Sequence, residues 1–343
     1  MKVLVTGGAG FIGSHTLDAL RARGDTTALL DDFNDFYDPA VKRRHAAATG
    51  ARIFEADLRD RPAVRAALQA FRPDAILHLA ARAGIRASIQ NPALYIDTNV
   101  TGTLNLLEEA VAAGVKSFVY TSTTSVFGAA LVPPVGAPAA WVTEDVAPVP
   151  KNIYGVTKAV AEDLCQLFHR NQRLPSIVLR TSRFFPEEDD DRTVRDAYAD
   201  DNAKANEYLH RRVDVEDVVS AHLLAARQAP SLGFRRYIVS ATTPFSTDDL
   251  ADLRRDAPSM VHRRVPHYEA EYARRHWTMV PSIDRVYVNA RARAELGWRP
   301  RYDFAFVIER LAAGQDFRSP LARLVGAKGY HAETFAEGPY PVE

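Results

Sequence analysis

Cysteine is nearly absent from this sequence of 343 residues, and so are segments that would direct a protein into a membrane. The single Cys165 cannot form an internal disulfide, and VAEDLCQLFH around it has the pattern of a helix with one buried side, which predicts an inert core thiol. The N-terminal MKVLVTGG has no basic leader or cleavage site, and no run approaches the about 18 apolar residues of a spanning helix. We therefore expect a cytoplasmic protein without a membrane partner.

An excess of either charge is also missing, because 43 basic residues balance 43 acidic ones. Nothing in this balance steers the molecule toward nucleic acid, so an anionic ligand has to be held by a local site. The ten histidines show no metal-ligand spacing, so we expect no metal. What the chain does have is 47% hydrophobic residues, enough for a large core in one big or two ordinary domains.

Short apolar runs alternate with longer amphipathic stretches through the first half of the chain. The runs VLV, AILHLA and FVY are almost wholly apolar, which is typical of strands covered on both faces. The predicted strands are 2–6, 26–31, 52–55, 75–80, 117–122 and 177–180, and the predicted helices are 12–23, 63–71, 92–113 and 153–172. This alternation predicts an α/β fold with a Rossmann-type doubly wound parallel sheet.

The pattern changes after Thr181, where the acidic run PEEDDD begins. Carboxylates in series repel one another, so we expect this run to be a solvated loop. A helical pattern then starts near Asp214, and a strand pattern covers residues 235–241. We expect residues 1–180 and 213–242 to form the sheet domain, and residues 181–212 and 243–343 to form a smaller mixed α/β lobe.

A glycine-rich turn follows the first predicted strand, where VLVTGGAGFIGSH places Gly7, Gly10 and Gly13 at the start of a helix. Without side chains the backbone can turn tightly and approach a pyrophosphate, which the N–H groups of a helix N-terminus stabilise. The position after an N-terminal strand makes this pattern specific for a dinucleotide. Asp31 and Asp32 end the second strand, where a carboxylate accepts hydrogen bonds from ribose hydroxyls and repels a 2′-phosphate, so the predicted cofactor is NAD rather than NADP.

The ends of the next two strands face the same edge of the predicted sheet. Asp57 and Leu58 are placed to meet the adenine, and the small residues of HLAA, residues 78–81, allow a close approach of the cofactor. His78 lies inside an apolar strand, so we interpret it as a hydrogen-bonded core histidine rather than a catalytic base.

YGVTK puts Tyr154 and Lys158 one turn apart on a predicted helix. The preceding strand end, YTSTTSVFG, offers hydroxyls that include Thr123, which can share a proton or hold a substrate oxygen. Lowering a phenol pKa from near 10 to about 7 requires roughly 4 kcal/mol. An ammonium about 4 Å away supplies on the order of 4 kcal/mol at an effective dielectric near 20. Lys158 is therefore expected to lower the pKa of Tyr154 almost unaided.

TGGAGFIGSH, the acid pair, HLAA, Asn99 in DTNVTGT, the hydroxyl-rich strand end and YGVTK together resemble the extended short-chain dehydrogenase/reductases, specifically the nucleotide-sugar epimerases and dehydratases. The segments DDFNDFYDPAVKRR and HLAARAGIRASIQNP are most similar to UDP-glucuronate 4-epimerases. The resemblance implies Tyr154, Lys158 and Thr123 as catalytic residues, and Asn99 on the nicotinamide side. The expected NAD-binding residues are Gly7, Gly10, Phe11, Ile12, Gly13, Asp31, Asp32, Asn34, Lys42, Asp57, Leu58, Leu79, Ala80, Ala81, Asn99, Thr121, Tyr154 and Lys158.

The second half departs from this family. LRTSRFFPEEDD puts Arg183 where relatives have a polar residue, and residues 186–211 are too few for the family's nucleotide-binding helix and loop. HRRVDVEDVV and VYVNARARAELGWRPRYDF still resemble family segments. The expected substrate-binding residues are Arg86, Ser88, Thr123, Thr124, Ser125, Arg183 and Arg285. The three arginines suit a phosphate or carboxylate, although each also fits a surface ion pair. The proline-rich stretch from Leu131 to Pro150, with an exposed Trp141, reads as a lid or as a passive loop.

Family dehydratases carry an acid after the catalytic hydroxyl, whereas Thr124 and Ser125 follow Thr123 here. The resemblance therefore favours a 4-epimerase of a UDP-sugar, possibly UDP-glucuronate, in which C4 is oxidised transiently and the hydride returns to the other face. A dehydrogenase, reductase or dehydratase on another substrate, and a non-catalytic NAD-binding regulator, remain alternatives. The family's dimer packs two long helices against their mates, so we expect a homodimer through residues 92–113 and 153–172.

Overall fold

The computed structural model describes residues 1–35, 38–189 and 191–325. Within them, parallel strands form a seven-stranded sheet in the order β3-β2-β1-β4-β5-β7-β8. The strands are β1 (Lys2–Thr6), β2 (Thr26–Asp31), β3 (Arg52–Glu55), β4 (Ala75–His78), β5 (Ser117–Thr123), β7 (Ser176–Thr181) and β8 (Phe234–Val239). The strand order reverses between β1 and β4, and such a switch point opens a crevice at the carboxyl ends of the strands. The predicted α/β class is confirmed.

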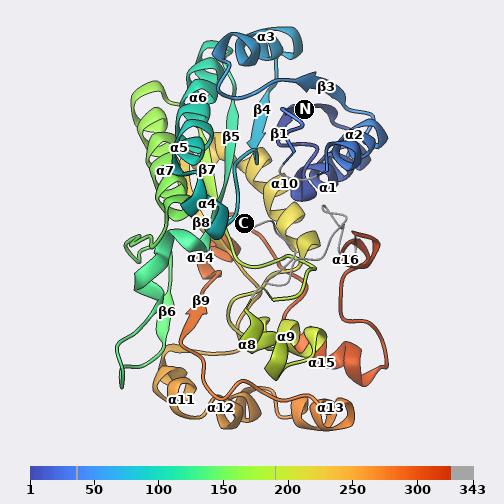
Figure 1. The fold of residues 1–343 in the computed structure, drawn as a ribbon, viewed down its shortest axis with the longest axis vertical. Coiled ribbons are helices and arrows are strands. Elements are labelled where there is room, and N and C mark those ends of the chain that lie inside the picture. Colours follow the sequence, from blue (N-terminus) through green and yellow to red (C-terminus); the bar gives the residue numbers. More distant parts are fainter. Residues whose placement is uncertain (36–37, 190, 326–343) are drawn as a thin grey trace.

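Alternation along each strand divides the core between the two faces of the sheet. Val3 and Val5 pack with Leu17 and Leu20 on one face, whereas Leu4 packs on the other. Each such side chain contributes about 1.5–3 kcal/mol when fully buried. The first face is covered by α1 (Phe11–Ala22) and α10 (Val215–Leu232), and the second by α3 (Arg61–Phe71), α6 (Gly102–Ala112) and α7 (Ile153–Gln172) (Figure 1).

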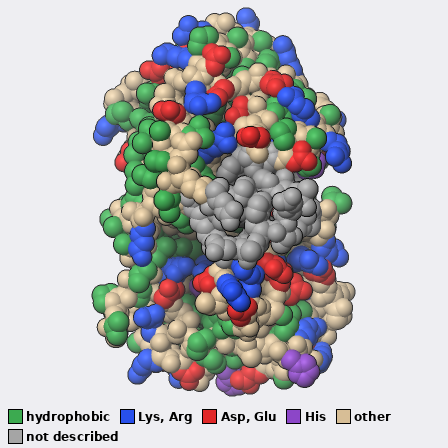
Figure 2. Space-filling model, viewed as in Figure 1, with side chains coloured by type: hydrophobic (Ala, Val, Ile, Leu, Met, Phe, Trp, Pro, Cys, Tyr) green, Lys and Arg blue, Asp and Glu red, His purple; other side chains and the backbone are tan. Residues whose placement is uncertain are grey.

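The smaller lobe lies beyond the carboxyl ends of the strands (Figure 1). Its helices are α8 (Arg192–Ala197), α9 (Asp200–Glu207), α11 (Leu250–Arg255), α12 (Ala257–Arg264), α13 (Tyr268–Arg275) and α15 (Phe304–Ala312). They enclose a separate apolar core that includes Tyr208, Tyr272 and Phe304. Side chains of both charges are interspersed over the visible face of the molecule, in keeping with its balanced composition (Figure 2).

A short parallel ribbon joins the two parts, formed by β6 (Ala140–Val142) and β9 (Arg285–Tyr287). Residues 140–142 of the proline-rich stretch are therefore held against the smaller lobe, and its role as a lid stays a prediction. Trp141 is partly buried against the core of the smaller lobe, so its predicted exposure is wrong. Backbone hydrogen bonds fix the ribbon, including Ala140 N–H to Asp284 O at 2.8 Å.

Two predicted elements end differently in the structure. Strand β4 stops at His78, which frees Leu79 and Ala80 to line a loop. The predicted helix 92–113 is divided into α5 (Pro92–Ile96), a π-helical turn (Asp97–Thr101) and α6. Within that turn the N–H of Gly102 reaches Asp97 O, one residue further back than in an α-helix. No residue pattern marked this bulge.

The acidic run is a loop in which Glu188 and Asp191 are exposed, as expected, whereas Asp189 is held by cations. Asp189 lies 3.2 Å from Arg183 and 3.7 Å from Arg211, and its side chain is 9% exposed. Lys204 donates a hydrogen bond to Pro186 O at 2.5 Å. The cations of the smaller lobe therefore compensate the repulsion that was expected to expose the carboxylates. The same part of the chain continues into the short helices α8 and α9, and whether they bind a nucleotide stays a prediction.

The remaining elements are short and mostly connect the larger ones. They are α2 (Pro39–Ala48), α4 (Ile85–Gln90), two 3₁₀ segments (Thr124–Leu131 and Thr247–Asp249), α14 (Ala290–Glu295) and α16 (Pro320–Val325). In the described ranges, no helix has both the length and the apolar character that a membrane span requires.

Candidate active site

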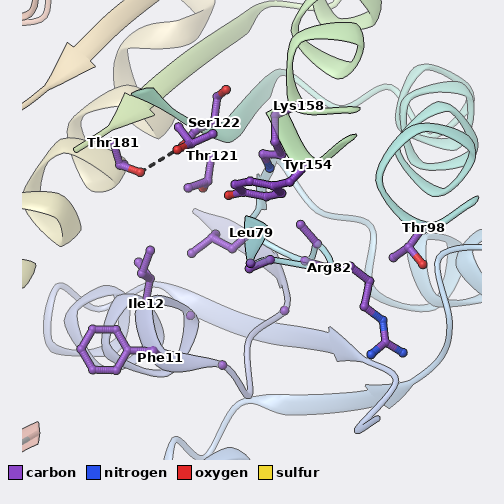
Figure 3. A pocket seen from close by; sticks show the side chains of 18 of the residues that line it. Phe11, Ile12, Leu79, Arg82, Thr98, Thr121, Ser122, Tyr154, Lys158 and Thr181 are labelled. Carbon is purple, nitrogen blue, oxygen red and sulfur yellow. Dashed lines mark hydrogen bonds between the residues drawn. The ribbon is translucent and has the colours of Figure 1, made fainter. Parts of the chain in front are cut away.

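A cavity of about 410 Å³ opens at the switch point between β1 and β4. Its wall is built from the β1–α1 turn, the ends of β2, β4 and β5, the start of α7 and residues 181–188 (Figure 3). Every residue predicted to bind NAD lines it except Asn99. The cavity also receives Thr123, Thr124, Ser125 and Arg183 from the predicted substrate set.

The glycines of the β1–α1 turn are required by close backbone contacts. A Cβ on Gly7 would lie 2.7 Å from Ala80 N, and the φ of Gly7 is +68°. A Cβ on Gly13 would lie 2.2 Å from Gly7 O. The N-cap residue of α1 is Gly10, which has no side chain to cap the helix, and Gly10 and Gly13 both line the cavity. This cradle fits the pyrophosphate of a dinucleotide.

Asp31 at the end of β2 is a buried carboxylate that also shapes the turn. Its oxygens accept hydrogen bonds from Ala9 N at 3.1 Å and Phe33 N at 3.0 Å. Burial raises the pKa of Asp31, whereas the charge of Lys42 and the backbone hydrogen bonds oppose that rise. Lys42 donates to Asn34 O at 2.9 Å, so the ribose end of the cavity contains a compact polar cluster.

Tyr154 and Lys158 lie one above the other at the far end of the cavity (Figure 3). The Asn152 side chain caps α7 by accepting from Gly155 N at 2.8 Å, which places Tyr154 in the first helical turn. The Lys158 ammonium lies 4.3 Å from the centre of the Tyr120 ring. Thr123 hydrogen-bonds the Tyr154 side chain, and all three predicted catalytic residues line the same cavity.

Burial changes the acid–base balance expected from the sequence. It raises the pKa of Tyr154 to about 12, partly offset by the hydrogen bond with Thr123. It lowers the pKa of Lys158 to about 7. The expectation that Lys158 alone brings the phenol near neutrality is therefore wrong for this structure, because desolvation penalises both charged forms.

Asn99 lies one layer behind the cavity wall, within the π-helical turn. Its Oδ1 accepts from Arg82 N at 2.7 Å, and its Nδ2 donates to Arg82 O at 3.0 Å and Thr157 Oγ1 at 3.1 Å. Asn99 thus fixes the loop after β4 to α7. His78 is hydrogen-bonded on both ring nitrogens, to Thr6 at 2.7 Å and Thr103 at 2.9 Å, and burial lowers its pKa to about 3.

The remaining residues predicted to bind substrate do not lie together in the structure. Ser88 is buried and donates to Ile85 O at 2.6 Å within its own helix. The side chain of Arg86 lies outside the described part of the structure. Arg183 is paired with Asp189 and with Glu207, at 3.2 and 3.3 Å.

Arg285 lines a second cavity of about 270 Å³ in the smaller lobe. Arg211 and Arg254 line it too, and two ion pairs lie in its wall, Arg211 with Glu207 and Arg285 with Asp284, both at 2.8 Å. His210 contributes a buried ring whose Nδ1 has no hydrogen-bond partner, and burial lowers its pKa well below the usual range. Because Glu207 also pairs with Arg183, one layer of ion pairs lies between the two cavities.

Several cavity residues were missed by sequence reasoning. They come from the loop after β4 and from the segment after β7, namely Arg82, Ala83, Gly84, Ser182, Phe184, Phe185, Glu187 and Glu188. The first group follows a strand end and could have been found by that signal. The second lies where the family resemblance fails. Among the described residues, no group of three or more His, Cys, Asp or Glu side chains could hold a metal ion.

The chain matches the NAD dependent epimerase/dehydratase family over residues 3–239. UDP-glucuronate 4-epimerase 6 of Arabidopsis thaliana is 39% identical over 189 residues, which are 54% of this chain and 39% of that protein. UDP-glucose 4-epimerase of Erwinia amylovora is 36% identical over 182 residues, 52% of each chain. The chain therefore spans about half the length, or less, of these curated relatives.

The solved UDP-glucose 4-epimerase of Thermus thermophilus, in complex with NAD, has a TM-score of 0.62 at 28% identity and covers 91% of this chain and 99% of that one. UDP-glucuronic acid 4-epimerase of Bacillus cereus, solved with UDP-glucuronic acid and NAD, has a TM-score of 0.63 at 22% identity and covers 90% and 97%. The second similarity shows the fold alone. The predicted family is confirmed, with NAD as the cofactor that its description names, and the chain belongs to the NAD dependent epimerase/dehydratase family.

Proposed function

We propose that this protein is an NAD-dependent 4-epimerase of a nucleotide sugar. The observation that carries the proposal is the meeting of Thr123, Tyr154 and Lys158 at the end of a cavity whose other end has a glycine cradle. Bound NAD would accept a hydride from C4 of the sugar and return it. The protein's own residues supply binding, orientation and proton transfer.

Tyr154 is the proposed base for the C4 hydroxyl, and Thr123 its partner in holding that oxygen. Lys158 stabilises the phenolate with its positive charge, against the burial that raises the pKa of Tyr154 to about 12. When the hydride returns to the other face of the 4-keto sugar, Tyr154 gives the proton back to the C4 oxygen. The cycle leaves no net redox change.

The second cavity is the proposed site for the nucleotide diphosphate. Arg211, Arg254 and Arg285 offer guanidinium groups that match phosphate oxygens, and the unpartnered His210 nitrogen adds a polar wall. The two domains are therefore proposed to bind different ligands. Residues 1–180 and 213–242 bind NAD, and residues 181–212 and 243–343 bind the substrate. The sugar would reach Tyr154 past the ion pair of Arg183 and Glu207.

Epimerisation is favoured over dehydration because Thr124 and Ser125 follow the catalytic hydroxyl, and neither side chain can act as a carboxylic acid. A dehydrogenase is the second candidate, since the family match ends at residue 239 and leaves most of the smaller lobe unmatched. UDP-glucose, UDP-glucuronate and UDP-N-acetylglucosamine should each be incubated with the protein and NAD, with products separated by chromatography. A C4 epimer without NADH supports the proposal, whereas stoichiometric NADH supports a dehydrogenase, and no turnover of any sugar contradicts both.

A homodimer in the cytoplasm is the proposed state of the protein. The supporting feature is an apolar face on α7, α4 and α5, made of the exposed Val156, Val160, Leu167, Ile89 and Ile96. Hydrophobic side chains gather along this edge of the molecule (Figure 2). A second copy is the occupant that fits, because the same face can pair with itself about a twofold axis. Light scattering should give twice the chain mass, and Val160→Glu should give a monomer.

A further inference from the structure

Glu162, one helical turn beyond Lys158, has the most extensively hydrogen-bonded carboxylate near the proposed active site. Its side chain is 1% exposed. It accepts hydrogen bonds from Ser122 Oγ at 2.6 Å, from Arg180 Nη2 at 2.7 Å and from Arg236 Nε at 3.1 Å. Two of the three donors are guanidinium groups, so this buried carboxylate is part of a network of ion pairs.

The three donors belong to three neighbouring strands. Ser122 is on β5 and Arg180 on β7, and the two are partners in the parallel register. Arg236 is on β8. Since Glu162 is on α7, this one carboxylate attaches the helix that carries Tyr154 and Lys158 to the strand that ends in Thr123. The hydrogen bond from Thr181 Oγ1 to Ser122 O, drawn in Figure 3, further ties β7 to β5.

The surroundings of Lys158 show why this carboxylate matters for its charge. The ionisable groups that face it are Tyr120 from β5, His78 from β4, and Tyr154, Glu162 and Cys165 from α7 itself. Glu162 is the only carboxylate in this set, and it is ion-paired with Arg180 and Arg236. Burial lowers the pKa of Lys158, and the charge of Glu162 opposes that shift.

We propose that Glu162 is a positioning residue that holds Lys158 as an ammonium ion beside Tyr154 and fixes α7 against the end of β5. The role of Lys158 itself rests on the proposed function. Glu162 touches neither of the described cavities, so it acts through Lys158 and through the helix.

Glu162→Gln tests the charge, because it keeps the shape but removes the carboxylate that pairs with Arg180, while Arg236 keeps its ion pair with Asp163 at 2.9 Å. The titration of Lys158 should then move down by about one pH unit, at the low end of what a nearby charge produces. The chain has seven lysines, so carbon-13 lysine NMR can follow each one, with Lys158→Arg as the assignment variant. The alkaline limb of the kcat profile should move down by the same amount.

Glu109→Gln is the matched control. Glu109 is also a buried glutamate, 3% exposed, that binds two arginines, Arg61 and Arg65, but it lies on α6 away from the cavity. Its loss should lower the melting temperature without moving the Lys158 titration. An equal titration shift in both variants, or none in folded Glu162→Gln, would overturn the proposal.

Arg236→Gln is expected to shift the Lys158 titration in the opposite direction. It also tests the proposal if Glu162→Gln does not fold. Arg236 is 21% exposed, and its removal leaves Glu162 less neutralised, so the Lys158 titration should move up by a smaller amount. No upward shift contradicts the proposal. Because the NMR titration uses no sugar nucleotide, a protein with shifted Lys158 and no epimerase activity would count against the proposed function alone.

Discussion

The two ends of the active-site region are built by different means. At the cofactor end the backbone decides the geometry, through the positive φ of Gly7 and the close approach of Gly13 to Gly7 O. In the smaller lobe charged side chains decide it, through the layer in which Arg183, Asp189, Arg211 and Glu207 pair with one another. Backbone geometry leaves a short motif in the sequence, whereas ion pairs between distant residues leave none.

The largest effect is expected at Tyr154, the proposed proton acceptor. Tyr154→Phe removes the proposed proton acceptor and should lower kcat about 10³-fold, within the range for general acid–base groups. NAD affinity should change little, as measured by fluorescence titration. Tyr302→Phe, which removes a phenol that donates to Glu216 at 3.0 Å, is the control and should keep kcat. Equal rates for Tyr154→Phe and the unchanged protein would rule out its role.

Gly13→Ala should disrupt the backbone geometry of the glycine-rich turn. The added Cβ would lie 2.2 Å from Gly7 O, so the turn has to move and NAD affinity should fall about a hundredfold. Gly10→Ala is the control, since its Cβ meets Gly7 O at 3.2 Å and needs a small adjustment. If both variants bind NAD equally well, the cradle is not the pyrophosphate site.

Arg285→Ala removes one of the guanidinium groups that line the second cavity. Loss of one charge-assisted hydrogen bond should raise KM for the nucleotide sugar about tenfold, with kcat and NAD affinity nearly unchanged. Arg235→Ala removes an exposed arginine that pairs with Glu295 on the surface and should alter none of these values. A KM that is unchanged in Arg285→Ala would remove the second cavity from the proposed substrate site.

The smallest effect concerns stability and pH. Burial lowers the pKa of Lys158 to about 7 from the ordinary 10.5, so between these values the unfolded chain binds the additional proton. Stability should therefore rise with pH across that window, by about 1.4 kcal/mol per pH unit at most from this group. Chemical denaturation of Lys158→Met should show a weaker rise than the unchanged protein. The same slope in both would mean that Lys158 titrates normally.

Sequence reasoning reached most of the sheet because its strands are short apolar runs with turn residues between them, as in VLVTGG. It located the cavity residues that follow strand ends, such as Asp57 and Ala80. It missed the π-helical turn at Asn99, since a single extra residue in a helix leaves the apolar spacing almost unchanged. It also missed the ion pairs of Asp189 within the acidic run, because the partners of Asp189 are not marked by any local pattern.

The effect of desolvation on the pKa values of Tyr154 and Lys158 was also not predicted from the sequence. Composition and spacing placed Lys158 beside Tyr154, but the free energy of removing both from water depends on how completely β5 and α7 close around them. That quantity belongs to the folded molecule and cannot be read from YGVTK alone.

The ribbon of β6 and β9 has a thermodynamic consequence. Strand β6 lies on the chain between Thr123 and Tyr154, and β9 begins with Arg285, whose register partner is Ala140. A ligand that orders β9 therefore also orders the connection between the proposed catalytic residues. By linkage, if a ligand in the first cavity raises the affinity of the second cavity through this ribbon, a ligand in the second cavity raises the affinity of the first by the same factor.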